Sequence, residues 1–247
     1  MSKSNQIQLS DHFTTGRLLK FTASPIIMMI FTSVYSVVDG FFISNFAGKT
    51  AFTALNLIYP YIQMLGCLGF MIGTGGSALV AMTLGMGDEK RANRLFSMLA
   101  VATVGIGAIF SAIGLALLRP VALLLGATPE LLSSCLLYGR ILLTFQTAFM
   151  LQYLFQSFFI AAEKPKLGLF FTVAAGVTNM VLDFVLVGVA GLGLAGAASE
   201  TKINQMVGGV APIFYFAKRR PGCRLYLTKP LFSLRELFKA CTNGISE

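Results

Sequence analysis

The chain has 247 residues, of which 55% are hydrophobic and only 12% are charged, with a mean hydropathy of +0.76. Soluble domains carry about 25% charged residues, so the composition excludes an ordinary soluble domain and indicates a membrane protein. The net charge of +9 would suggest a nucleic-acid partner in a soluble protein, but here the basic residues are placed as membrane topology requires, and no such partner is expected.

Six apolar segments are predicted to cross the lipid bilayer, so the expected fold class is all-α, a polytopic membrane protein. They cover about residues 18–44, 54–84, 95–118, 132–161, 167–190 and 194–217. Each is long enough for a bilayer core about 30 Å thick, and none shows the strict alternation of a barrel strand. We therefore expect a six-helix transmembrane unit over residues 18–217, preceded by a cytoplasmic N-terminus at 1–17.

The residues after the last span, 218–247, mix basic side chains with Leu and Phe. This pattern predicts an amphipathic cytoplasmic segment, close to the membrane surface, that stops before a seventh span. Fifteen of the 19 Lys and Arg residues lie in the N-terminal region, in the second and fourth breaks between spans and in this tail, whereas the other three breaks hold only Lys49 and Arg119. The positive-inside rule then places both ends of the chain in the cytoplasm of a bacterium, with the spans in its inner membrane.

The residue types that carry most enzyme chemistry are scarce. The only histidine is His12, in the polar leader, and the four cysteines have no CxxC spacing. A zinc site or a disulfide framework is therefore not expected, and neither is a cofactor or an enzymatic activity.

Five ionisable residues fall inside the predicted spans, namely Asp39, Arg140, Asp183, Glu200 and Lys202. Each costs about 2.5–3.5 kcal/mol at mid-membrane on insertion scales unless it faces a polar interior. At 1.5 Å per residue, all five lie roughly 7–12 Å below the outer surface, so four helices place charges in one layer. We expect this layer to be a water-accessible cavity that opens to the outer face.

Polar neighbours extend this layer. Asn179 and Asp183 are four residues apart and share a helix face, as do Tyr35 and Asp39, and Thr201 lies at the same depth. A carboxylate in such surroundings can carry a proton, bind a cation or alternate between the two. The candidates for binding the proton or cation and the substrate are therefore Tyr35, Asp39, Asn179, Asp183 and Thr201. No metal site is predicted, and Na⁺ at Asp39, Asp183 and Asn179 stays open as the alternative to a proton.

A structural interpretation stays open beside the functional one. Asp183 could pair with Arg140 or Lys202 and simply hold helices together. Glu200 and Lys202 are two residues apart, point in different directions and each need a partner of their own. Arg140 is interpreted as structural or as a tuner of the carboxylates.

Two glycine motifs are interpreted as structural. GLGLAG at 191–196 matches a dinucleotide-binding pattern, but it lies in a tight hairpin between two spans and not between a strand and a helix. GFMIG at 69–73 places two glycines four residues apart and predicts close helix packing.

Three stretches in order resemble the MATE (multidrug and toxic compound extrusion) transporters. They are SVVDGFFISNFAGKTAFTALNLIYP, GMGDEKRA and AAEKPKLGLFFTVAAGVTNMVLDFVLVGVAGLGLAGAASET. The resemblance implies one six-helix lobe of a twelve-helix protein, with the C-terminal lobe as a missing partner. It also implies export of organic, cationic compounds in exchange for H⁺ or Na⁺.

The resemblance carries over to particular residues. An Asp in the first span and an Asn and Asp in the fifth match Asp39, Asn179 and Asp183, with Tyr35 and Thr201 beside them. Pro25 matches a proline at which the first span is thought to bend. The pattern departs at Glu200 and Lys202, where small or apolar residues are more usual.

The function expected is that of a multidrug efflux antiporter, with the bilayer and small organic cations as its partners. A flippase of related fold for lipid-linked saccharides is an alternative, although only Arg140 and Lys202 would be available for a pyrophosphate. An intramembrane enzyme is disfavoured by the lack of histidine in the spans. A nonfunctional truncated product is the remaining alternative.

Overall fold

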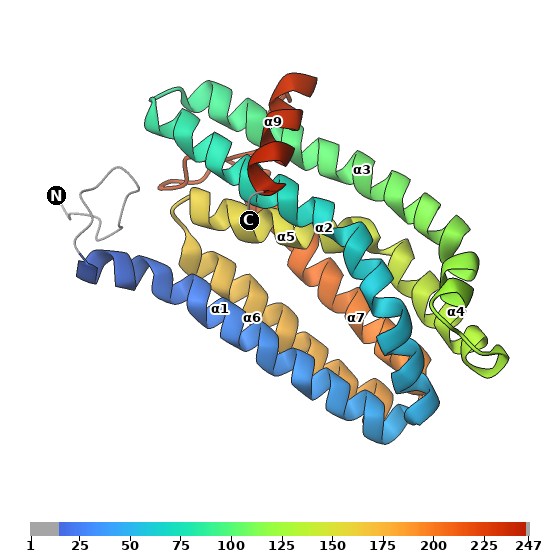
Figure 1. Ribbon diagram of the computed structural model, residues 1–247. Helices are drawn as coiled ribbons and strands as arrows, with labels where there is room; N and C mark the ends of the chain where they lie inside the picture. Colours follow the sequence, from blue (N-terminus) through green and yellow to red (C-terminus); the bar gives the residue numbers. More distant parts are fainter. Residues whose placement is uncertain (1–14, 246–247) are drawn as a thin grey trace.

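The computed structural model describes residues 15–245, and within this range the chain is folded into helices without any strand (Figure 1). The all-α class predicted from the sequence is therefore confirmed. Most of the predicted N-terminal segment at 1–17, including His12, lies outside the described residues.

Eleven helical segments follow one another along the described chain. They are α1 (Thr15–Phe42), η1 (Ile43–Ala47), α2 (Lys49–Gly85), α3 (Glu89–Leu124), α4 (Pro129–Thr144), α5 (Gln146–Ala161), α6 (Pro165–Leu182), η2 (Asp183–Val189), α7 (Gly193–Gly209), α8 (Ala211–Phe216) and α9 (Leu234–Ile245). The two η segments are π-helices that continue α1 and α6. Figure 1 shows α1 and α6 lying side by side, with α7 behind α2 and with α9 crossing α2.

Four helices of the described chain are long and apolar enough to cross a membrane, and α4 with α5 make a fifth if this bent pair is counted as one span. The sixth predicted segment, 194–217, is helical but differs from the others. Its main helix, α7, has only 17 residues, and from its middle onwards polar side chains replace apolar ones, at Glu200, Lys202, Asn204 and Gln205. Length and composition alone therefore do not mark α7 as a span.

The bend of 53° between α4 and α5 lies at Phe145, where the sequence has neither proline nor glycine. One side chain of a neighbouring helix satisfies a backbone carbonyl next to the bend, and a side chain at the bend bonds to a neighbouring helix. Ser111 of α3 donates to the Leu143 carbonyl at 2.5 Å, and the buried Gln146 amide donates to the Ile62 carbonyl of α2 at 3.2 Å. A bend in an apolar bundle is tolerated when its polar backbone groups find partners in this way.

Glycines on α2 allow its neighbours to approach closely. A Cβ on Gly69 would lie 2.6 Å from Met150 Cα, and one on Gly73 would lie 3.0 Å from Leu154 Cα, both on α5. Only a hydrogen atom fits at such distances, so the packing role predicted for this glycine pair is confirmed.

The C-terminal segment is attached to the bundle. The loop before α9 is held to α3, because Asn93 Oδ1 accepts from the Tyr226 backbone N–H at 2.7 Å. Helix α9 is strongly amphipathic, as predicted, and buries Ala240 and Gly244 against α2 while Phe238 remains exposed.

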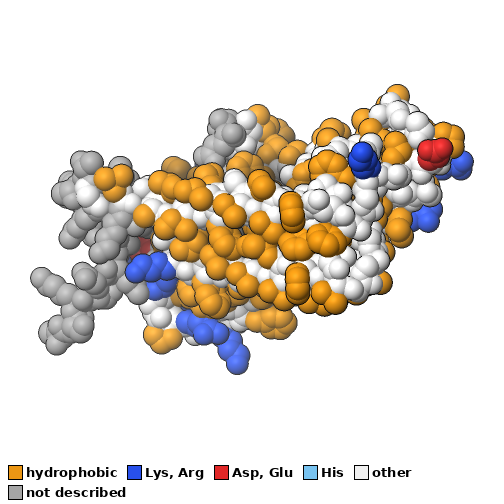
Figure 2. All heavy atoms as spheres, turned by 90° about the horizontal axis from the view of Figure 1, so that it is seen from below, with side chains coloured by type: hydrophobic (Ala, Val, Ile, Leu, Met, Phe, Trp, Pro, Cys, Tyr) orange, Lys and Arg blue, Asp and Glu red, His pale blue; other side chains and the backbone are white. Residues whose placement is uncertain are grey.

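Apolar side chains cover the long sides of the bundle. Figure 2 shows them along the helices, with Lys and Arg gathered towards the two ends. On α1 alone the exposed apolar residues include Ile26, Met29, Ile30 and Val37. A surface of this kind suits hydrocarbon, and it fits the predicted membrane location.

Candidate functional site

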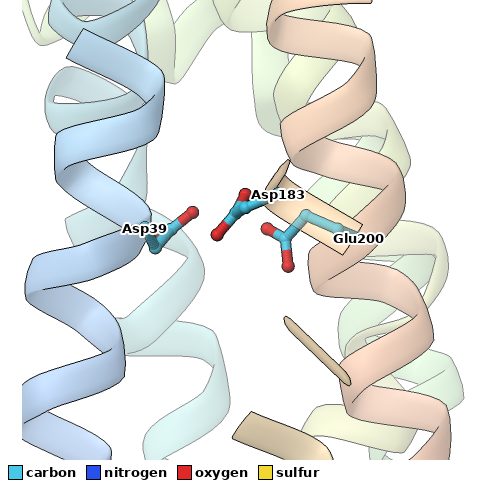
Figure 3. Close-up of side chains that lie close together, drawn as sticks. All are labelled: Asp39, Asp183 and Glu200. Atoms are coloured by element: carbon cyan, nitrogen blue, oxygen red, sulfur yellow. The ribbon is translucent and has the colours of Figure 1, made fainter. Parts of the chain in front are cut away.

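Three carboxyl groups from three different segments converge in the bundle. Asp39 comes from α1, Asp183 from the first residue of η2 and Glu200 from α7. One oxygen of each lies within 4.8 Å of the other two, and Figure 3 shows the three side chains directed towards one another. The structure thus brings Asp39 and Asp183 together and adds Glu200, which the sequence assigned only to tuning or ion pairing.

The chain changes from α-helix to π-helix at Asp183. Helix α6 ends at Leu182, and η2 continues from Asp183 to Val189. Single turns of π-helix are rare in proteins, but those that occur are frequently found at functional sites. The wider turn changes the direction of the side chains that follow it. A second π-helical turn, η1, begins four residues after Asp39. Neither segment has a sequence signal that revealed it.

Close packing of α1 on α6 sets the position of Asp39. A Cβ on Gly176 would lie 2.5 Å from Phe31 Cε1 and 2.9 Å from Tyr35 Cδ1. Since Tyr35 is one turn before Asp39, the missing side chain at Gly176 lets this part of α1 approach α6. Asp39 therefore faces Asp183 across a short distance.

Hydrogen bonds connect Glu200 to its neighbours. Asn179 donates its amide N–H to Glu200 Oε2, which joins α6 to α7. The Thr201 hydroxyl lies 2.5 Å from Glu200 Oε1 and 3.0 Å from the Ala197 carbonyl. One carboxyl oxygen of Asp39 also lies within 4.8 Å of one of Glu200. Two ionised carboxylates this close repel each other, so a proton or a cation between them is favourable.

Two polar residues of this layer were missed from the sequence. Tyr138 of α4 is 2% exposed and lies near Thr201, and Asn204 of α7 is 5% exposed and lies near Tyr35. Asn204 follows Glu200 by four residues, which is the same spacing that identified Asn179 and Asp183. Applying that spacing to the sixth segment would have found it.

Two of the three carboxylates are closed off from solvent. Asp183 and Glu200 are both 0% exposed and Asn179 is 2% exposed. Within the described part of the chain, both Asp183 oxygens and Asn179 Oδ1 are buried without a hydrogen-bond partner, as is Asp39 Oδ1. The open, water-accessible layer predicted from the sequence is therefore wrong for Asp183 and Glu200 in this structure, because α1, α6 and α7 pack around them.

The two basic residues of the predicted layer do not neutralise these acids. Arg140 is exposed, and the Lys202 ammonium lies over the Phe145 ring, 5.2 Å from its centre. Arg91 pairs with Glu236 and Arg224 with Glu89, both away from the site. The pairing of Arg140 or Lys202 with the acids, which the sequence left open, is therefore not observed in the described chain. Residues two apart on a helix point about 200° apart, so Lys202 turns away when Glu200 faces inward.

Pro25 lies inside α1, which continues through it as a single helix. The structure thus places this residue as the sequence predicted, in the first span. Its role as a hinge stays a prediction.

The chemistry available at the site is that of oxygen donors. Three carboxyl groups, the Asn179 amide and the Thr201 hydroxyl can bind protons or hard cations. No nitrogen or sulfur ligand for a softer metal belongs to the set.

Comparison with known proteins gives a family. The MatE family model matches residues 25–185, which is more than half of the chain. The multidrug export protein MepA of Staphylococcus saprophyticus is 23% identical over 202 residues, which cover 82% of this chain and 45% of that protein. The probable multidrug resistance protein YoeA of Bacillus subtilis is 23% identical over 195 residues, or 77% of this chain and 42% of that protein. The chain therefore spans less than half the length of these relatives.

Solved structures share the fold. A MOP superfamily transporter from Pyrococcus furiosus superimposes with a TM-score of 0.85 at 19% identity, over 92% of this chain and 50% of that chain. A MATE protein in its straight conformation gives a TM-score of 0.84 at 20% identity, over 92% and 51% of the two chains. Superposition on a MATE protein in its bent conformation gives a TM-score of 0.83. With its helical bundle, its apolar surface and the match over residues 25–185, the chain belongs to the MatE family of membrane transport proteins.

Proposed function

We propose that this chain forms one half of a multidrug efflux antiporter that exports organic cations in exchange for H⁺ or Na⁺. The convergence of Asp39, Asp183 and Glu200 within 4.8 Å carries the proposal. The names of the staphylococcal and Bacillus relatives, a multidrug export protein and a probable multidrug resistance protein, support it.

Charge balance explains how such a site exchanges cations. Carboxylates buried without a Lys or Arg partner are costly, so each must hold a proton or a cation. A coupling ion and a cationic substrate then compete for Asp39 and Asp183. Binding of the ion from one side releases the substrate, and binding of the substrate from the other side releases the ion. Tyr35 and Tyr138 offer aromatic faces that favour organic cations.

Transport further requires that the site face the two sides of the membrane in turn. The chain spans about half of the structures it matches, and a second six-helix lobe is therefore proposed as its partner. Alternating access would arise from rocking of the two lobes around the carboxylates. The proposed orientation places the N-terminus in the cytoplasm of a bacterium and the spans in its inner membrane.

The acidic character of the site favours this function over the flippase. A lipid-linked pyrophosphate needs several cationic groups, whereas the three residues that converge here are acids and Arg140 is exposed. Thermal stabilisation by cationic dyes, but not by lipid pyrophosphates, is the expected result.

The decisive experiment is dye efflux from cells that express the chain together with a second six-helix lobe. Asp39→Asn and Asp183→Asn should each abolish efflux with expression intact, because each removes a charge that binds the coupling ion and the substrate. Glu130→Gln changes an exposed acid at the start of α4 and serves as the matched control. Efflux unaffected by both Asp substitutions would refute the proposal.

A second arm identifies the coupling ion. Efflux from vesicles is measured under an imposed pH gradient and then under a Na⁺ gradient. If only one of these gradients accelerates efflux, its ion is the coupling ion. Efflux that responds to neither gradient would contradict antiport.

A further inference from the structure

We propose that Glu200 converts the Asp39–Asp183 pair into a binding site for a divalent hard cation of the Ca²⁺ type. The inference concerns the site used in the proposed function and rests on its carboxylates. It is nevertheless measured by ion binding and not by transport, so the two proposals can fail separately.

Charge is the first argument. When Asp39, Asp183 and Glu200 are ionised they carry three negative charges, and no Lys or Arg of the described chain forms an ion pair with them. A single monovalent ion would leave two charges uncompensated in a buried place, whereas a divalent ion leaves one. Because uncompensated buried charge is costly, the third carboxylate selects for the higher ionic charge.

Distance is the second argument. Calcium–oxygen bonds are about 2.3–2.6 Å long, so two ligands of one ion are at most roughly 5 Å apart. One oxygen from each of the three carboxyl groups lies within 4.8 Å of the others, which satisfies this limit. Figure 3 shows the Asp183 carboxyl between those of Asp39 and Glu200, close to both.

An independent observation comes from Asn179, which is not an acid. Asn179 is 2% exposed. Its side-chain amide lies at the cluster, because the amide N–H donates to Glu200. The Oδ1 of the same amide is buried without a hydrogen-bond partner in the described chain. A buried carbonyl oxygen without a donor normally costs about 1–3 kcal/mol, and coordination of a cation would compensate for this cost.

The ligand set also distinguishes between divalent ions. All the donors are oxygens, which disfavours zinc, for which cysteine and histidine are the usual ligands. Mg²⁺ normally keeps several of its waters, and Asp183 and Glu200 are 0% exposed, so a hydrated ion is not easily accommodated. Ca²⁺ accepts six to eight oxygen ligands in flexible geometry, which carboxylates together with an amide can supply.

The binding of Tb³⁺, a luminescent substitute for Ca²⁺, tests the inference on the purified 247-residue chain in lipid nanodiscs. The chain has seven tyrosines and no tryptophan, and the buried Tyr138 lies near Thr201, the residue that follows Glu200. Tyrosine excitation should therefore produce saturable Tb³⁺ emission. Ca²⁺ should displace Tb³⁺ at lower concentration than Mg²⁺ or Na⁺.

Glu200→Gln keeps the size of the side chain and removes its charge. It should weaken Ca²⁺ competition by about tenfold or more, since ligand charge sets Ca²⁺ affinity. Glu130→Gln removes a charge of the same kind from the surface and should leave binding unchanged. Circular dichroism confirms that the variants are folded. Asp39→Asn, at a less buried position, must weaken binding as well and replaces Glu200→Gln if that variant does not fold.

Two results would overturn the inference: no saturable Tb³⁺ emission from the parent chain, or equal Ca²⁺ affinity in the parent and in the folded carboxylate variants. Saturable Ca²⁺ binding that depends on Glu200, together with dye efflux that is unchanged by Asp39→Asn and by Asp183→Asn, would instead uphold the inference and refute the proposed function. Efflux that depends on both Asp residues without Ca²⁺ binding would do the reverse.

Discussion

Asn179 of α6 donates its side-chain amide N–H to Glu200 Oε2 of α7, and both residues are buried. This contact links the span that carries Asp183 to the helix that carries the third carboxyl group. It also fixes the direction of the Asn179 amide, whose Oδ1 remains without a donor in the described chain. The contact is therefore both a structural link between two helices and part of the candidate cation site.

The energy of this contact can be measured with a double-mutant cycle. Asn179→Ala should reduce the free energy of unfolding by about 1–3 kcal/mol, because it leaves a buried carboxyl oxygen without its donor. Glu200→Ala removes the acceptor, and the double variant should lose less than the sum of the two single losses. A coupling energy on the order of 1 kcal/mol is expected from unfolding in SDS–detergent mixtures. Additive losses would mean that the contact contributes nothing.

Much of the site followed from depth and helical spacing. Asp39, Asn179 and Asp183 were identified because charges are expensive in apolar spans and because residues four apart share a helix face. These two rules fix height along a helix and grouping on one helix. They do not fix how each helix is rotated relative to its neighbours.

Rotation is the reason why Glu200 and Lys202 could not be assigned. They are two residues apart on α7, so only one of them can face the carboxylates, and the sequence does not say which. In the structure Glu200 is 0% exposed inside the cluster, while the Lys202 ammonium lies 5.2 Å from the centre of the Phe145 ring. The bend at Phe145 was equally hidden, because the hydrogen bonds beside it, from Ser111 of α3 to the Leu143 carbonyl and from Gln146 to the Ile62 carbonyl of α2, join residues far apart in sequence, and no proline or glycine marks it.

Gly176→Ala tests the packing that places Asp39. The new Cβ would lie 2.5 Å from Phe31 Cε1 and 2.9 Å from Tyr35 Cδ1, so both rings must shift. We expect a loss of about 1–3 kcal/mol in the free energy of unfolding, as is typical of overpacking. Gly105→Ala is the matched control, since no atom lies within 4 Å of a Cβ on that exposed helical glycine. Equal stabilities of the two variants would contradict the close contact between α1 and α6.

Gly75→Ala tests the docking of α9 on α2. A Cβ on Gly75 would collide with the Ala240 carbonyl and lie 2.5 Å from the Gly244 backbone nitrogen. Because backbone atoms cannot move aside as a side chain can, α9 should separate from α2. Limited trypsin digestion should then cut faster after Arg235 and Lys239, both exposed residues of α9. Gly85→Ala, for which no atom lies within 4 Å, should leave the rate unchanged. A rate unaffected by Gly75→Ala would show that α9 is not held there.

The turn between α5 and α6 is strained at Glu163. Its φ of +58° is left-handed, and it is the only residue other than glycine with positive φ among residues 15–245. The backbone N–H of Glu163 donates to the Ile160 carbonyl at 3.0 Å, and that of Lys164 donates to the Phe159 carbonyl at 2.8 Å. This is the Schellman pattern that ends many helices, in which glycine usually occupies the position of Glu163.

Two substitutions at this position separate strain from side-chain contacts. Glu163→Ala removes the contacts of the carboxylate and keeps the left-handed strain, whereas Glu163→Gly removes both. The left-handed conformation costs roughly 1–2 kcal/mol for a residue with a Cβ, so the Gly variant should be more stable than the Ala variant by on the order of 1 kcal/mol. Thermal unfolding in detergent measures the difference, and matching midpoints would contradict strain at Glu163. A Gly variant that is also more stable than the parent chain would further show that the strain outweighs whatever the Glu163 carboxylate contributes.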